Sequence, residues 1–156
     1  MVCHAWGVEH THYVVSEVPF PDASNLLWTI GAGILFGLAA MLFSRSIGFW
    51  SGMAKRISIP FRPLIGGLVI AAAVWMIGTT KYIGLGVPTI VASFSEQQMW
   101  YDFLLKILFT TFTIGVGFKG GEVTPLFFVG ATLGSALSAV VPLPMGLLAG
   151  IGFVAV

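Results

Sequence analysis

Residues 115–125 read Gly-Val-Gly-Phe-Lys-Gly-Gly-Glu-Val-Thr-Pro and interrupt a chain that is otherwise strongly apolar on both sides. The glycines let the backbone turn freely. Pro125 suits the first turn of a new helix, because its missing N–H would be unpaired there in any case. Thr124 is a suitable N-cap for that helix. The stretch therefore predicts that one helix ends near residue 115 and that another begins near residue 124.

The composition around this stretch is that of an integral membrane protein. Of the 156 residues, 57% are hydrophobic and 8% are charged, whereas about a quarter are charged in a soluble domain. Seven basic and six acidic residues give a net charge of +1. This excludes a disordered chain, which is polar and highly charged, and it provides no basic surface for nucleic acid. The expected surroundings are a lipid bilayer.

Apolar segments on both sides of the stretch predict further membrane helices, since a membrane-spanning helix needs about 20 apolar residues. The predicted helices cover residues 26–43, 64–78, 103–118, 124–141 and 143–156. Asp22 or Ser24 could cap the first of them. The apolar segment 83–94 is too short to span and is interrupted by glycine and proline. In lipid, such irregular backbone is tolerated only where protein buries it or where it lines a watery cavity.

The fold class expected from these segments is an all-α integral membrane bundle with broken and re-entrant helices. Residues 1–25 are predicted to form a polar loop between helices, and residues 26–156 a transmembrane domain that is incomplete at both ends. Small residues four apart on one helix face let helix backbones approach closely in lipid. Such pairs are Gly33/Gly37, Gly130/Gly134 and Gly146/Gly150.

The glycine-rich stretch also favours an anion site. Gly115, Gly117 and Gly120 fit G-x-G-x-x-G, but a dinucleotide site needs a preceding strand and a βαβ unit, and membrane helices flank this one. A helix start instead offers unpaired N–H groups and a positive dipole end to an anion. The N–H groups of Glu122 and Val123 are the predicted donors. The alternative is a plain glycine loop between two spans.

Glu122 is the candidate for moving protons. A carboxylate inside a membrane is costly and is by default a functional candidate. The helix dipole favours its charged form and desolvation favours its neutral form, so it could carry a proton. Two alternatives remain: Glu122 lies in an exposed turn, or it pairs with Lys119 as a structural contact.

Residues 117–134, Gly-Phe-Lys-Gly-Gly-Glu-Val-Thr-Pro-Leu-Phe-Phe-Val-Gly-Ala-Thr-Leu-Gly, closely resemble a signature of the CLC chloride channel and anion/proton antiporter family. In that family a Gly-x-Phe-x-Pro motif begins a helix whose backbone amides hold the central anion. Gly121 and Pro125 match the motif, while Val123 stands where phenylalanine is usual. The Gly-Glu-Val-Thr-Pro variant is similar to a bacterial branch that includes fluoride/proton antiporters, in which the glutamate is associated with proton coupling.

The resemblance implies an internal fragment of a CLC inverted-repeat fold, with further anion-holding motifs upstream and downstream of the residues present. It implies transport of chloride or fluoride, of the voltage-gated chloride channel or antiporter type, with protons as a second substrate. It also implies a homodimeric full-length protein in the bacterial inner membrane, with no enzymatic activity and no cofactor. The candidate anion-binding residues are Gly120, Gly121, Glu122, Val123, Thr124 and Pro125, with Glu122 the candidate for proton coupling. The alternative function is a structural or degenerate membrane module without transport of its own.

Two weaker signals remain. Cys3, His4, Glu9, His10 and His12 suggest a metal, but their spacing fixes no geometry, so no metal site is predicted. Nor do these histidines favour a haem-binding subunit, because they precede the predicted spans.

Lys106 lies inside an apolar helix, four residues after Asp102. The order suits an i,i+4 ion pair. Snorkelling of the lysine toward the end of the helix is the simpler interpretation.

Overall fold

The computed structural model describes residues 15, 18, 20 and 22–156, and every regular element in these residues is helical. This confirms the all-α fold class. The elements are α2 (Ala23–Ala54), the 3-10 turn η1 (Ile59–Phe61), α3 (Arg62–Ile77), α4 (Val87–Ala92), α5 (Asp102–Gly115), α6 (Val123–Leu137) and α7 (Met145–Ala155). Residues 23–25, predicted as loop, are already the first turn of α2, and Asp22 is its N-cap without a side-chain hydrogen bond.

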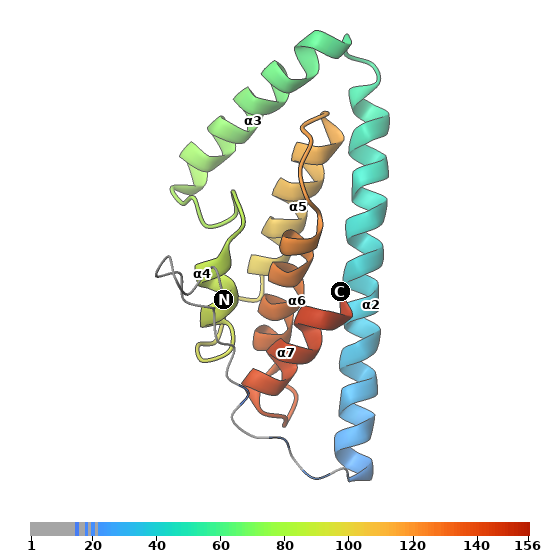
Figure 1. The fold of residues 1–156 in the computed structure, drawn as a ribbon, viewed down its shortest axis with the longest axis vertical. Helices are drawn as coiled ribbons and strands as arrows, with labels where there is room; N and C mark the ends of the chain where they lie inside the picture. Colours follow the sequence, from blue (N-terminus) through green and yellow to red (C-terminus); the bar gives the residue numbers. More distant parts are fainter. Residues whose placement is uncertain (1–14, 16–17, 19, 21) are drawn as a thin grey trace, which may run out of the picture.

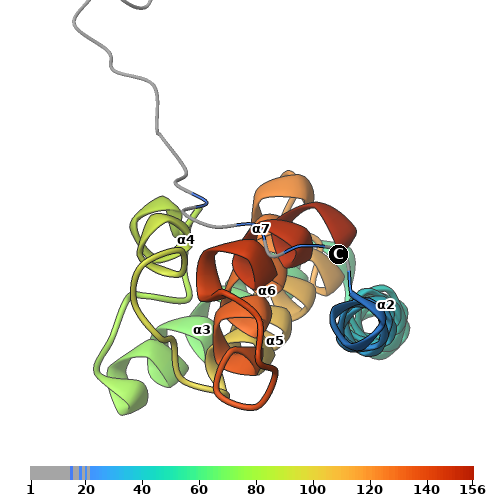
Figure 2. The same ribbon diagram turned by 90° about the horizontal axis from the view of Figure 1, so that it is seen from below.

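Helix α2 forms one side of the molecule, and α4 lies on the opposite side, with α5, α6 and α7 packed between them (Figures 1 and 2). The most extensive helix contacts join α6 to α7 and α2 to α5. Helix α3 slants away from the far end of α2 (Figure 1). In the described residues, α2 and the segment Ile59–Ile77 are long and apolar enough to cross a membrane, while α6 and α7 are shorter apolar helices.

Three of the predicted segments differ from the structure for clear reasons. The segment 103–118 was too long for α5, which ends at Gly115 because the chain turns at Gly117, where φ is 102°. The segment 26–43 was too short a prediction for α2, which continues to Ala54 because nothing after Phe43 stops a helix until the Lys55 C-cap. The segment 124–141 was too long for α6. That helix ends at Leu137, and the prolines at 142 and 144 keep the following chain out of a helix until α7 begins.

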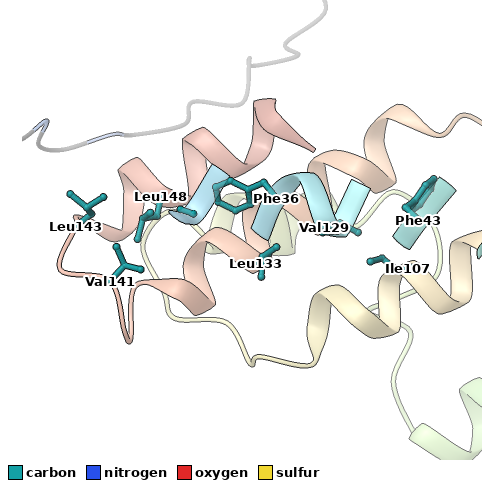
Figure 3. Packing of buried hydrophobic residues seen from close by; sticks show 10 residues of the cluster. Phe36, Phe43, Ile107, Val129, Leu133, Val141, Leu143 and Leu148 are labelled. Carbon is teal, nitrogen blue, oxygen red and sulfur yellow. The ribbon is translucent and has the colours of Figure 1, made fainter. Parts of the chain in front are cut away.

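The apolar core lies where α2, α5, α6 and α7 meet. Phe36 and Phe43 of α2 are buried against α6 and α5, and Leu148 of α7 closes the cluster (Figure 3). A second cluster contains Tyr82, Ile90, Phe109, Phe128 and Ala131, and it joins α4 and the loop before it to α5 and α6. The middle of α6, from Phe128 to Leu133, is therefore packed in the core on both sides of the helix.

Close glycine packing is confirmed for the predicted pair Gly130/Gly134, whereas a Cβ at Gly150 of the pair Gly146/Gly150 would make only ordinary contacts, with Val15 and Phe94. A Cβ at Gly130 would collide with the backbone of Gly152, and one at Gly134 with the backbone of Leu148, so α6 and α7 touch through their main chains. A Cβ on Gly33 or Gly37 of α2 would instead meet open space among the described residues. The i,i+4 spacing alone did not distinguish the packed face of a helix from an unpacked one.

Candidate functional site

The predicted helix break is present. Helix α5 ends at Gly115, and Gly117 has a φ of 102°, a left-handed conformation that favours glycine. The chain then runs through residues 118–121 to Glu122, which is the N-cap of α6 and makes no side-chain cap hydrogen bond. The prediction of Thr124 as the cap was wrong, because Thr124 is the second residue of the helix.

The start of α6 has backbone donors without acceptors in the helix. The first N–H groups of any α-helix lack an intrahelical partner, which here applies to Val123 and Thr124, while Pro125 has no N–H. The carbonyl of Glu122 accepts from Leu126 N at 3.1 Å, closing the first turn. Glu122 and Val123 are exposed in the chain and Pro125 is buried. The free N–H groups of the first turn point along the helix axis toward the chain that precedes α6, at the positive end of the dipole.

A cavity of about 610 Å³ borders this helix start. Gly120, Gly121 and Pro125 line it, together with residues of α3, of α5 and of the loop between α3 and α4. Most of its lining is apolar. The polar side chains that reach it come from Tyr82, Thr110 and Thr113. Three of the six predicted anion-site residues therefore border the same cavity. The other three, Glu122, Val123 and Thr124, lie between Gly121 and Pro125 in the chain.

The Glu122–Lys119 pair is not formed. Among the described residues, an ion pair is present only between Lys81 and Asp102, with Nζ 2.6 Å from Oδ2. Glu122 is exposed in the chain, so a structural salt bridge does not account for it. No group of three or more potential metal ligands occurs in the described part of the chain. The Cys3, His4, Glu9, His10 and His12 segment lies outside the described residues.

Asp102 does not pair with Lys106, although the i,i+4 spacing suits such a pair. Asp102 is buried and accepts from Lys81 Nζ and from the Tyr82 hydroxyl, each at 2.6 Å. The loop between α3 and α4 carries these two partners to Asp102, and the sequence offers no local sign of that contact across about twenty residues. Asp102 therefore fixes the loop to the start of α5.

Lys106 does not snorkel, because only 1% of the residue is exposed. Its Nζ donates to the carbonyl oxygens of Gly84 at 2.6 Å and Tyr82 at 3.2 Å. The same nitrogen lies 4.8 Å from the centre of the Phe128 ring. The sequence signal for this contact is a lysine inside an apolar helix, together with a preceding loop that contains Gly84 and Gly86.

The fold and the site define an integral membrane protein of broken helices with a helix start beside a cavity. The chain belongs to the voltage gated chloride channel family, whose family model matches residues 1–156. The chain is 50% identical over 163 residues to a chloride/fluoride channel protein of Pseudomonas syringae pv. tomato (strain ATCC BAA-871 / DC3000). That alignment covers 99% of the chain and 36% of the relative, so the chain spans about a third of the relative's length. The resemblance to the CLC family is thereby confirmed.

Proposed function

We propose that the chain forms part of a transmembrane pathway for chloride or fluoride, with the anion held at the start of α6, residues 120–125. The observation that carries this proposal is the position of Gly120, Gly121 and Pro125 on the wall of the 610 Å³ cavity. The printed name of the Pseudomonas syringae relative, a chloride/fluoride channel protein, supports the same substrates. Family membership supports anion transport in general.

In this proposal the anion is bound mainly by backbone. The N–H groups of Glu122, Val123 and Thr124 supply donors at the positive end of the helix dipole. The Thr124 hydroxyl can add one side-chain donor. Gly120 and Gly121 carry no side chain, so an ion can approach the main chain closely there. No cofactor is needed for such a site.

Glu122 is proposed to couple anion movement to protons, which would make the protein an antiporter. A carboxylate at the N-cap competes with a bound anion for the same helix-start donors. Protonation removes the negative charge and with it that competition. The absence of an ion-pair partner for Glu122 within the described residues supports this role, since a fixed partner would hold the carboxylate away from the site. The proposed setting is a homodimer in a bacterial inner membrane.

The test uses the protein encoded by the complete reading frame, reconstituted in liposomes with fluoride, chloride and pH electrodes. The wild type is expected to move an anion and protons in opposite directions. Glu122→Gln is expected to keep anion movement and lose proton movement. Glu96→Gln, which changes another exposed glutamate, is the matched control and is expected to behave as wild type.

Two results would contradict the proposal. Unchanged proton coupling in Glu122→Gln would remove the role of that residue. Absence of anion flux in the wild type would favour the second candidate, a membrane module without transport of its own.

A further inference from the structure

The loop between α3 and α4 is folded around the side chain of Lys106. Its alternate residues Tyr82 and Gly84 direct their carbonyl oxygens at Lys106 Nζ. Two residues further on, a Cβ at Gly86 would lie 3.7 Å from the same nitrogen and would press on the Phe128 ring. Gly84 and Gly86 both have a φ of 70°. This left-handed backbone, which glycine adopts without strain, allows the loop to curl around the lysine.

The same loop is a wall of the cavity at the start of α6. Tyr82, Ile83, Gly84 and Leu85 line that cavity together with Gly120 and Gly121. Lys106 itself is buried and is not among the described residues that line the cavity. The two carbonyl oxygens that it binds are therefore directed into the protein.

The direction of these oxygens matters to an anion. A carbonyl oxygen carries partial negative charge, and in surroundings of low dielectric constant its repulsion of an anion is stronger than in water. A backbone carbonyl without a partner seeks a donor or water. Without Lys106 Nζ, the nearest place where the two carbonyl oxygens could meet water would be the cavity. The oxygens would then turn toward the path of the ion.

We propose that Lys106 is a positioning residue for anion binding, which holds the Tyr82 and Gly84 carbonyl oxygens away from the cavity and keeps its wall free of negative oxygen. The inference rests on the proposed function, because it needs an anion in that cavity. In this inference, Lys106 of α5 and the loop between α3 and α4 contribute to anion affinity in addition to the motif at residues 121–125.

The experiment compares Lys106→Met and Lys106→Gln with wild type in the complete protein. Methionine carries no N–H donor, and the glutamine amide is neutral and ends one atom short of the Lys106 Nζ position, so neither replaces the charged donor to both carbonyl oxygens. The KM for anion flux is expected to rise about tenfold, because carbonyl oxygens turned toward the cavity repel the anion, with kcat within about twofold. Lys55→Met, which removes an exposed lysine at the end of α2, is the matched control and is expected to leave KM unchanged.

A second measurement does not depend on transport. Hydrogen–deuterium exchange of the peptide covering residues 82–86 is expected to be faster in both Lys106 variants than in wild type, because the loop has lost its anchor. A folded variant with wild-type exchange, or with wild-type KM, overturns the inference. Failure of both variants to assemble also overturns it, since Lys106 would then act on stability alone. A wild type that carries no anion rejects the proposed function, while the exchange data still decide whether Lys106 anchors the loop.

Discussion

The Tyr82 hydroxyl donates a 2.6 Å hydrogen bond to Oδ1 of Asp102 and so joins the cavity wall to the first turn of α5. The second carboxylate oxygen, Oδ2, accepts from Lys81 Nζ at 2.6 Å and from Met99 N at 3.2 Å. Both oxygens of this buried side chain are thus satisfied, and the helix start is fixed to a loop about twenty residues earlier in the chain.

Asp102→Asn is expected to destabilise the protein by about 1–3 kcal/mol, because an amide cannot accept on both sides and its NH₂ would face a donor. Tyr82→Phe leaves the buried Oδ1 of Asp102 without its donor and should cost about 1–3 kcal/mol. Thermal unfolding in detergent measures both effects. Asp22→Asn is the control, because Asp22 is exposed and makes no side-chain cap bond. Equal melting temperatures for Asp102→Asn and this control would contradict the prediction.

Gly130→Ala is expected to separate α6 from α7, since its new methyl group would collide with the backbone of Gly152. Overpacking of this kind costs about 1–3 kcal/mol. Gly33→Ala adds the same methyl group to a helix where it meets open space, so it should be neutral or stabilising by about 0.5–1 kcal/mol. The melting temperatures of the two variants are compared in one detergent. A stable Gly130→Ala protein would show that the close packing of α6 on α7 is absent.

Ser135→Ala is expected to loosen the chain between α4 and α5. The Ser135 hydroxyl donates to the Glu96 carbonyl and accepts from Gln98 N, both at 3.0 Å. Removing this buried hydroxyl leaves the Gln98 N–H without its acceptor, at a cost of about 1–3 kcal/mol, while the Glu96 carbonyl keeps the Gln98 side-chain amide as a donor at 3.2 Å. Ser138→Ala is the control, because Ser138 bonds only the nearby Ser135 carbonyl among the described contacts. Faster proteolysis or hydrogen exchange at residues 95–99 in Ser135→Ala alone is the expected result.

Gly84→Ala is expected to strain the cavity wall through the backbone alone. A Cβ at this position meets no atom, but the φ of 70° is unfavourable for alanine by about 1–2 kcal/mol. Gly84→Asn should be milder, since asparagine tolerates this conformation better. The order of thermal stability should therefore be wild type, then Asn, then Ala. An Ala variant as stable as wild type would mean that the loop can adopt another conformation.

The sequence was informative where the determinants of structure are local. The glycines and Pro125 place the start of α6 within one residue of its position, because turn freedom and a fixed proline φ act on the residues themselves. The resemblance to the CLC family was found in residues 117–134, and the family model that confirms it matches residues 1–156. The irregular backbone at the start of segment 83–94 was also predicted, and residues 83–85 line a cavity, as expected for broken backbone.

The partners of Asp102 and Lys106 were not predictable in this way. Both contact a loop 20–24 residues away, and an i,i+4 spacing suggested a local pair instead. Which pair of glycines is packed is likewise decided by the neighbouring helix and not by the spacing. Tertiary contacts of this kind leave no periodic signal in a single sequence.

The length of α6 has a consequence for the electrical behaviour of the proposed site. At about 1.5 Å per residue, the 15 residues of α6 rise about 22 Å, less than the roughly 30 Å hydrocarbon core of a bilayer. The two ends of α6 therefore cannot both reach a membrane surface. If the C-terminal end of α6 lies at one membrane surface, its N-terminal end lies inside the bilayer. An anion bound there has crossed only part of the membrane potential. The whole potential is worth about 2.3 kcal/mol per charge at 100 mV, so a fraction of that energy would make occupancy of the site depend on voltage.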